Sequence, residues 1–308
     1  MFSDALSDIV VLDGGLATEL ERRGHATSGG LWSARVLLEN PEAIEQLHYD
    51  YYSAGADCVI SASYQATYEG FADAGLTEDQ TTALLLKSVA LADSARDRIA
   101  STSTNPRNRW IAASIGPYGA RLQDGSEYHG MYNVSVETIA EFHEERLGVL
   151  AESGADVLAC ETVPLLDEAR ALSMLLRNQP ESEAWLTFTS PDGIHTSHGE
   201  DLAEGARFLD GVQNVVAVGV NCLKPQHVAA AIAELRKGTA KPLVVYPNSG
   251  EVWNSPEWKW DGAPTNTRLA ALAREWIDAG ARIVGGCCRT GVADIAELAR
   301  ALGRSTAR

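Results

Sequence analysis

Three of the five cysteines lie at the ends of short apolar runs, where they could bind a metal ion together. Cys222 ends one such run, and Cys287 and Cys288 end another. Three thiolates that meet at one point can hold Zn²⁺ and leave its fourth tetrahedral position open for a substrate. Neighbouring residues on a regular strand face opposite ways, so Cys287 and Cys288 can share a metal only where the backbone departs from ideal pleating. The two glycines just before them would permit such a departure.

Spacing alone leaves other interpretations of these cysteines open. Cys222 could be buried core filler, with Cys287 and Cys288 as accidental neighbours in the sequence. The same two cysteines could instead form a redox-active vicinal disulfide. The remaining cysteines, Cys58 and Cys160, lie inside apolar runs, and for them we expect buried apolar filler.

Two acidic residues also end otherwise apolar runs. A carboxylate at the position of Asp13 or Glu161 is costly to bury unless it is paired. The partner could be an arginine, in a structural salt bridge, or the ammonium group of a ligand. Gly14 and Gly15 follow Asp13 and add backbone N–H groups that could bind a ligand carboxylate. Carboxylates beside amide donors would suit an α-amino acid.

Other common catalytic motifs are absent from the sequence. There is no Gly-rich dinucleotide motif after a strand, no phosphate-binding loop and no Gly-x-Ser-x-Gly elbow. The seven histidines include no pair spaced i, i+4. His195 and His198 lie in a turn-rich segment, where a solvated loop is the expected structure.

Two long connections stand out between the apolar runs. Residues 116–134 contain three tyrosines and a histidine, and residues 247–266 contain Trp253, Trp258 and Trp260. Loops of this length in a compact domain are often functional. Their aromatic residues could pack as a lid, or they could line a site for a sulfonium or ammonium cation.

Eight apolar runs are spread along the chain and lack clean alternation, as expected for strands that are buried on both faces of a parallel sheet. They occupy residues 9–15, 57–63, 110–116, 156–162, 185–190, 215–222, 242–248 and 282–288. Segments with helical spacing lie between them, among them residues 41–54, 78–100, 136–153, 226–237 and 269–279. This alternation predicts an α/β fold, a (β/α)₈ TIM barrel, with a doubly wound open sheet as the alternative. No linker divides the chain, so we expect a single domain over residues 1–308.

The functional residues of such a barrel lie at the carboxyl ends of its strands, where the cysteines and acids fall. The chain has 308 residues and a formal net charge of −17, which argues against a broad surface for nucleic acid or anionic membrane. No window approaches the roughly 18 apolar residues of a membrane span, and the first residues lack the pattern of a signal peptide. We therefore expect a cytoplasmic protein, without a disulfide framework.

The sequence resembles the homocysteine S-methyltransferase family over almost its whole length. The resemblance runs from LDGGLATELERRG at residues 12–24 to GGCCRTGVADIAEL at residues 285–298. Between them lie further matching segments: LWSARVLLENPEAI, ISASYQAT, SIGPYGA, DGSEY, ACETVP, VGVNC and VVYPNSGE. Of these segments, DGSEY, ACETVP and VVYPNSGE look most like the bacterial and plant branch that uses S-methylmethionine. The betaine-dependent branch is less similar, since it has a tyrosine where Thr162 stands, and the cobalamin-dependent enzymes carry modules for which this chain has no room.

The resemblance implies a role for each matching residue. Cys222, Cys287 and Cys288 would be the ligands of a Zn²⁺ cofactor and the catalytic centre. Asp13 and Glu161 would bind the ammonium group of homocysteine, and the amides of Gly14 and Gly15 its carboxylate. Further residues match motif positions near the barrel mouth: Ser63, Gln65, Ser114, Thr162, Asn221 and Asn248.

The resemblance also implies a reaction, in which a sulfonium donor methylates L-homocysteine to give L-methionine. S-methylmethionine is the expected donor, with S-adenosylmethionine as a further possibility. The alternatives are a betaine-type enzyme, a methyltransferase for selenocysteine or selenohomocysteine, and a non-methylating thiol-redox barrel that uses Cys287 and Cys288. The expected partners are small molecules, and the expected state is a monomer or small homo-oligomer.

Overall fold

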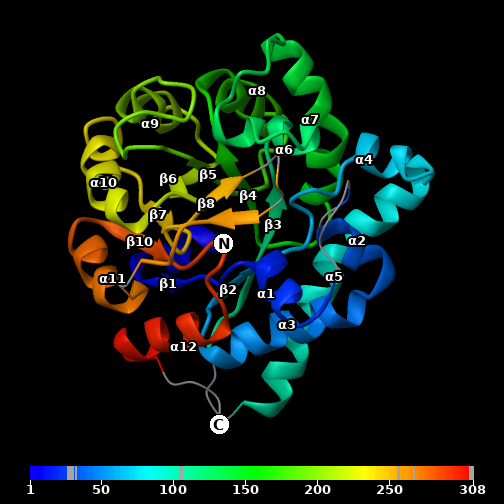
Figure 1. The fold of residues 1–308 in the computed structure, drawn as a ribbon, viewed down its shortest axis with the longest axis horizontal. Coiled ribbons are helices and arrows are strands. Elements are labelled where there is room, and N and C mark those ends of the chain that lie inside the picture. Colours follow the sequence, from blue (N-terminus) through cyan, green and yellow to red (C-terminus); the bar gives the residue numbers. More distant parts are fainter. Residues whose placement is uncertain are drawn as a thin grey trace.

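Eight parallel strands form a single sheet that closes into a barrel, with helices around its outside (Figure 1). This computed structural model describes residues 1–25, 31, 33–103, 107–254, 257, 259–265 and 268–304. The sheet order is β1-β10-β7-β6-β5-β4-β3-β2. Its two edges meet where Leu12 pairs with Cys58 and the Asp57 amide donates to the Val11 carbonyl at 2.7 Å. The predicted (β/α)₈ barrel is therefore confirmed, and closure rules out the open doubly wound sheet.

The strands of the barrel alternate with helices along the chain. The strands are β1 (Val10–Val11), β2 (Cys58–Ile60), β3 (Trp110–Ile115), β4 (Val157–Val163), β5 (Ala184–Phe188), β6 (Val215–Asn221), β7 (Leu243–Tyr246) and β10 (Ala281–Val284). The α-helices are α1 (Leu16–Arg22), α2 (Ser33–Glu39), α3 (Pro41–Ala54), α4 (Tyr68–Asp73), α5 (Glu78–Thr102), α6 (Tyr118–Leu122), α7 (Val136–Ala151), α8 (Leu166–Leu176), α9 (Leu202–Asp210), α10 (Val228–Arg236), α11 (Leu269–Asp278) and α12 (Val292–Ala301). Short 3₁₀ helices are η1 (Phe2–Ser7), η2 (Ser126–Tyr128) and η3 (Pro225–His227).

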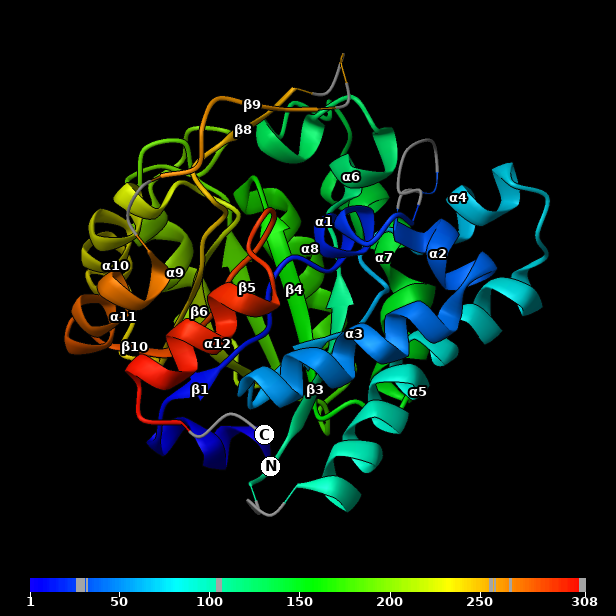
Figure 2. The same ribbon diagram turned by 60° about the horizontal axis from the view of Figure 1, so that its bottom comes forward.

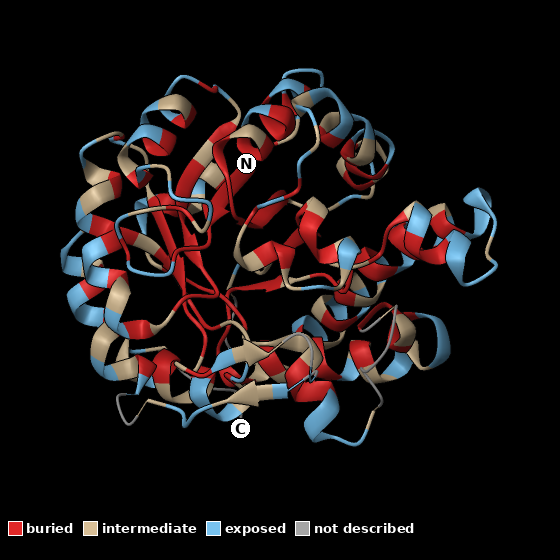
Figure 3. Ribbon diagram, turned by 45° about the horizontal axis from the view of Figure 1, so that its top comes forward, coloured by how far each residue is buried: buried red, intermediate tan, exposed pale blue. Residues whose placement is uncertain are grey.

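The core has two layers, and alternation along each strand decides which layer a side chain joins. On β4, Val157 and Ala159 point into the barrel, whereas Leu158 and Cys160 pack against the surrounding helices. Most residues of the barrel strands are buried (Figure 3). Cys58 and Cys160 are fully buried in these apolar layers, so their prediction as core filler is confirmed. The next inward position of β4 after Ala159 is Glu161.

The two ends of the barrel differ. At the amino end of the strands, η1 packs beneath the sheet, and the Phe2 ring centroid lies 5.7 Å from those of Trp110 and Trp185. At the carboxyl end, the antiparallel hairpin of β8 (Val252–Asn254) and β9 (Lys259–Asp261) lies across the barrel (Figure 2). No helix among the described residues is both long and apolar enough to span a bilayer.

Several strands end earlier than the sequence predicted, and this is a correction to the expected boundaries. The run 282–288 is a strand only to Val284, because the following residues bond to loops instead of a regular ladder. The Gly286 amide donates to the Asp13 carbonyl at 3.0 Å, and the Cys287 amide to the Pro247 carbonyl at 2.8 Å. The expected loop 247–266 also differs, since part of it forms the β8–β9 hairpin.

Replacing Gly219 with alanine is expected to destabilise the barrel. Gly219 lies on β6 opposite Val244 of β7, and a Cβ atom there would lie 1.8 Å from the Val244 carbonyl oxygen. The strands must move apart to admit it, so we expect a loss of roughly 3 kcal/mol or more in the free energy of unfolding, measured by urea denaturation. Gly148 on α7 has open space around it, so Gly148→Ala is the control, with an expected gain of about 0.5–1 kcal/mol. Equal stabilities of the two variants would contradict the prediction.

Candidate active site

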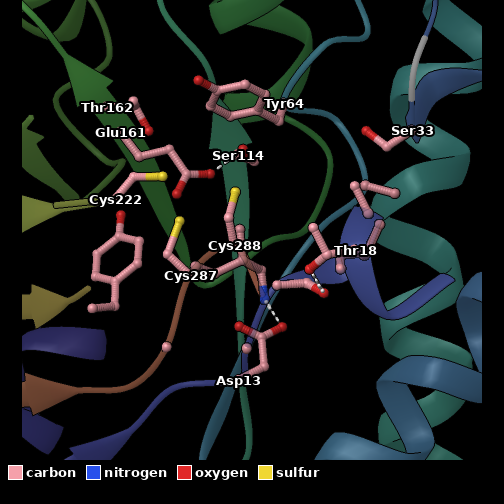
Figure 4. Close-up of a pocket in the computed structure, with 18 of the residues that line it drawn as sticks. Asp13, Thr18, Ser33, Tyr64, Ser114, Glu161, Thr162, Cys222, Cys287 and Cys288 are labelled. Atoms are coloured by element: carbon pink, nitrogen blue, oxygen red, sulfur yellow. Dashed lines mark hydrogen bonds between the residues drawn. The ribbon is translucent and has the colours of Figure 1, made fainter. Parts of the chain in front are cut away.

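The three cysteines nominated by the sequence come together at the carboxyl end of the barrel (Figure 4). Their Sγ atoms all lie within 4.8 Å of one another. Cys222 follows β6 directly and is buried, and Cys287 and Cys288 lie in the turn after β10 and are half-buried. Because that turn has left the pleated strand, adjacent residues can face the same point. The predicted departure from ideal pleating is thus confirmed.

The backbone of this turn is held tightly. The hydroxyl of Thr290 donates to the Cys287 carbonyl at 2.6 Å, and Arg289 has a positive φ of 67°. The Arg289 guanidinium forms two hydrogen bonds with the Glu251 carboxylate, at 3.0 and 3.1 Å. Glu251 lies just before the β8–β9 hairpin, so this ion pair ties the cysteine turn to the connection after β7.

The three cysteine thiols differ in pKa. Hydrogen bonds from the thiols of Cys287 and Cys288 hold the pKa of Cys222 well below its usual range, and the same contacts raise the pKa of Cys287 and Cys288. Three anionic sulfurs at this separation repel one another unless a cation lies among them. Within the described part of the chain, no other three cysteine, histidine or acidic side chains are brought together in this way. The sulfur-only donor set fits a soft divalent metal such as zinc.

Asp13 and Glu161 lie beside the cysteines, and both carboxyl groups are buried. One Asp13 oxygen, Oδ2, accepts from the Ile60 amide at 2.9 Å, and the other, Oδ1, has no partner. Glu161 accepts a hydrogen bond from the Ser114 hydroxyl. Burial raises the pKa of Asp13 well above its usual range and that of Glu161 to about 7. Neither forms an ion pair with a basic residue of the described chain, so the salt-bridge interpretation is not supported.

A local irregularity of β4 directs Glu161 into the mouth. The pairing register with β5 shifts between Cys160 and Val163, as at a β-bulge, and Thr162 has a positive φ of 60°. A β-branched residue is strained in that conformation. The Asn221 side chain offsets the strain, because it accepts from the Thr162 amide at 2.7 Å and donates to the Thr162 hydroxyl at 2.8 Å.

A cavity of about 720 Å³, counting its open mouth, lies over the cysteines. Of the predicted residues, the ones along its wall are Asp13, Gly14, Gly15, Ser114, Glu161, Thr162, Cys222, Cys287 and Cys288. The structure does not bring Ser63, Gln65, Asn221 or Asn248 to this wall. Ser63 instead donates to the Ser114 carbonyl, and Asn248 to the Cys222 carbonyl.

The two glycines after Asp13 pack closely against the cysteine turn. A Cβ atom on Gly14 would lie 2.5 Å from the Thr290 carbonyl oxygen, and one on Gly15 would lie 2.6 Å from that of Cys287. The Gly15 amide already donates to the Thr290 carbonyl at 2.8 Å. Close packing therefore accounts for both glycines, and the binding of a substrate carboxylate by their amides stays a prediction.

Two residues that no sequence pattern singled out also line the cavity, Glu127 from η2 in the long connection after β3 and Tyr246 from the end of β7. Tyr128, one of the loop tyrosines predicted to form a lid or a cation site, lines it as well, and its contact with a cation stays a prediction. The Tyr128 hydroxyl lies 3.4 Å from the Cys222 sulfur. The DGSEY motif was the signal, because it singled out this loop without showing which of its residues point inward.

Trp253 and Trp260, two tryptophans of the second long connection, lie outside the cavity wall. Their rings face each other across the β8–β9 hairpin in a tilted arrangement, with centroids 5.4 Å apart and an interplanar angle of 53°. Trp258 falls outside the described residues. Neither described tryptophan lines the cavity, so their predicted contact with a cation stays a prediction.

Comparisons with known proteins find similar chains that share one family description. A family model described as homocysteine S-methyltransferase matches residues 10–302. Homocysteine S-methyltransferase YbgG of Bacillus subtilis (strain 168) is 50% identical over 294 residues, which cover 94% of this chain and 93% of that protein. Selenocysteine Se-methyltransferase of Brassica oleracea var. italica is 42% identical and covers 91% of this chain and 85% of its own length. Among solved structures, the crystal structure of the homocysteine methyltransferase MmuM from Escherichia coli in its metallated form superposes with a TM-score of 0.86. The two sequences are 47% identical, and the match covers 94% of this chain and 95% of that one.

Proposed function

This chain belongs to the homocysteine S-methyltransferase family, and we propose that it methylates the thiol of L-homocysteine with a sulfonium donor, giving L-methionine. S-methylmethionine is the donor we favour, with S-adenosylmethionine as the second candidate. The observation that supports this most is the convergence of three cysteine sulfurs beside two buried carboxylates that have no basic partner. Three converging thiolates are a typical ligand set for a metal ion, and a buried carboxylate without a basic partner can be neutralised by the ammonium group of a substrate.

We propose Zn²⁺ as the metal, held by Cys222, Cys287 and Cys288. When bound there, zinc would favour the thiolate form of a substrate thiol at neutral pH. The low pKa of Cys222 supports this assignment, because that sulfur gives up its proton most readily. Reduced thiols are needed at this site, which favours a cytoplasmic location.

The carboxylates of Asp13 and Glu161 would hold the ammonium group of homocysteine. Each is buried, and the free Oδ1 atom of Asp13 is an acceptor without a donor. An ammonium group supplies both the charge and the N–H groups that these oxygens lack. Fixing that end of the substrate would direct its sulfur towards the cysteines, and the gain in rate would come from positioning.

Methyl transfer then needs no acid or base from the protein. Homocysteine first loses its thiol proton to water, and the resulting thiolate sulfur attacks the methyl carbon of the sulfonium to form a new carbon–sulfur bond. The bond from that carbon to the donor sulfur breaks, and its electron pair stays on the donor sulfur. The donor leaves as a neutral thioether, so no leaving-group proton is required. With S-methylmethionine, both products are methionine.

A donor panel tests this proposal. The zinc-loaded protein is incubated with homocysteine and S-methylmethionine, S-adenosylmethionine or glycine betaine, and methionine is measured. We expect turnover with one or both sulfonium donors and none with betaine. Because one relative is named for selenocysteine, selenocysteine is included as an acceptor. The thiol-redox alternative predicts no stoichiometric zinc under reducing conditions, so metal analysis of the same sample separates the two classes.

A further inference from the structure

The wall of the cavity carries more carboxyl groups than the single ammonium group of homocysteine can pair with. Three carboxyl groups line it, those of Asp13, Glu127 and Glu161, and no lysine, arginine or histidine of the described chain lines it. Homocysteine brings one ammonium group, which the proposed function assigns to Asp13 and Glu161. The Oε2 atom of Glu127 is left without a partner from the protein or from this substrate.

Glu127 is held in place by its loop, and one of its carboxylate oxygens lacks a hydrogen-bond donor. It lies in η2, where the preceding Ser126 amide donates to the Asp124 carboxylate at 2.9 Å. Its side chain lines the cavity and the residue is only 8% exposed, yet its Oε2 atom has no hydrogen-bond partner. A buried carboxylate oxygen without a donor is costly. The next residue, Tyr128, has its hydroxyl 3.4 Å from the Cys222 sulfur, so η2 lies against the cysteine centre.

We propose that Glu127 binds the α-ammonium group of the methyl donor. This inference rests on the proposed function and names the donor's binding residue at the same site. The unpaired Oε2 atom of Glu127 is a hydrogen-bond acceptor, so its partner must carry an N–H or O–H donor. A sulfonium carries positive charge but no such hydrogen, whereas an ammonium group has three. The ammonium therefore fits Glu127, and the sulfonium methyl is free to face the homocysteine sulfur beside Cys222.

This assignment makes Glu127 a specificity-determining residue. Sulfonium amino acids such as S-methylmethionine and S-adenosylmethionine carry the required ammonium group. Glycine betaine and dimethylsulfoniopropionate carry a positive charge without any N–H, so they leave Glu127 buried and unpaired. An interaction site that is left without its partner discriminates strongly against the analogue that lacks it.

The test is Glu127→Gln, which keeps the shape of the side chain and removes its charge. With S-methylmethionine we expect the donor KM to rise roughly 10- to 100-fold, the scale of one hydrogen bond to a charged group. The homocysteine KM should stay within about twofold, which also shows that the variant is folded. Glu127→Asp keeps the charge at shorter reach and should recover part of the loss. Glu141→Gln is the matched control, because it makes the same change at an exposed carboxylate on α7, away from the cavity wall, and should leave the donor KM within about twofold.

An unchanged donor KM in Glu127→Gln would overturn the inference, as would an equal rise in the homocysteine KM. Inhibition by dimethylsulfoniopropionate gives a second measure. It should be at least as strong in Glu127→Gln as in the wild type, because the variant has no buried charge for this compound to leave unpaired. A weaker inhibition of the variant would mean that Glu127 responds to the sulfonium instead, and would also overturn it. Failure of the proposed function has a different signature, because then the wild-type protein itself would form no methionine from homocysteine and S-methylmethionine.

Discussion

Replacing Cys222 with serine is expected to abolish stoichiometric zinc binding and to lower methyl transfer by on the order of 10³-fold or more. Cys222 supplies the buried sulfur of the centre and is the most readily ionised of the three. A serine hydroxyl is a harder and far less acidic ligand than a thiol, so it cannot replace the thiolate. The loss of activity should therefore follow the loss of metal. We expect the same result for Cys287→Ser and Cys288→Ser.

The measurement is zinc per chain after dialysis, together with kcat/KM for methionine formation. Cys160→Ala is the matched control, because Cys160 is also buried but packs in the apolar layer between the sheet and its helices. That variant should lose roughly 1 kcal/mol of stability and keep its zinc. A Cys222→Ser protein with full zinc and full activity would show that the three sulfurs do not form the metal site.

The barrel and its cysteine centre could be predicted because both depend on coarse patterns. Buried parallel strands are continuous apolar runs, and their carboxyl ends meet at one mouth. Those two facts place Cys222 near Cys287 and Cys288 before any coordinates are known. They do not show where each strand stops. The turn after β10 depends on hydrogen bonds to Asp13 and Pro247, which lie far away in the sequence.

The depth of each side chain at the mouth was harder to predict. Asn221 was predicted to lie near the barrel mouth, and its amide bonds to Thr162 through both its oxygen and its nitrogen, with the nitrogen also 4.0 Å from the Cys287 sulfur. That role depends on a bulge between β4 and β5, which no local pattern in the sequence reveals. Glu127, in contrast, was not singled out from the sequence but lines the cavity. It lies in a loop whose path is set by packing against α6 and β4, so its approach to the cavity emerges only in three dimensions.

Removing the two carboxylates that face homocysteine is expected to have the second largest effect. Asp13→Asn and Glu161→Gln should each raise the homocysteine KM by up to about 100-fold, since each removes one charged acceptor of the ammonium group. The donor KM should change little, the opposite of the result for Glu127→Gln. If the two carboxylates act independently, the double variant should lose about the product of the two factors. A change confined to the donor KM would contradict the assignment.

The pH dependence of the homocysteine KM provides an independent check on Glu161. Burial raises the pKa of this carboxyl group to about 7, and only its ionised form can pair with an ammonium group. Binding should therefore strengthen as the pH rises through 7 and weaken below it, as the carboxylate takes up a proton. Ionisation of the substrate thiol adds its own pH dependence, but that contribution is common to the wild type and Glu161→Gln. The homocysteine KM of Glu161→Gln divided by that of the wild type, measured from pH 6 to 8, isolates the contribution of Glu161. This ratio should grow as the pH rises, because the wild type gains a negative charge that the variant lacks. A constant ratio would show that Glu161 does not titrate against the bound ammonium.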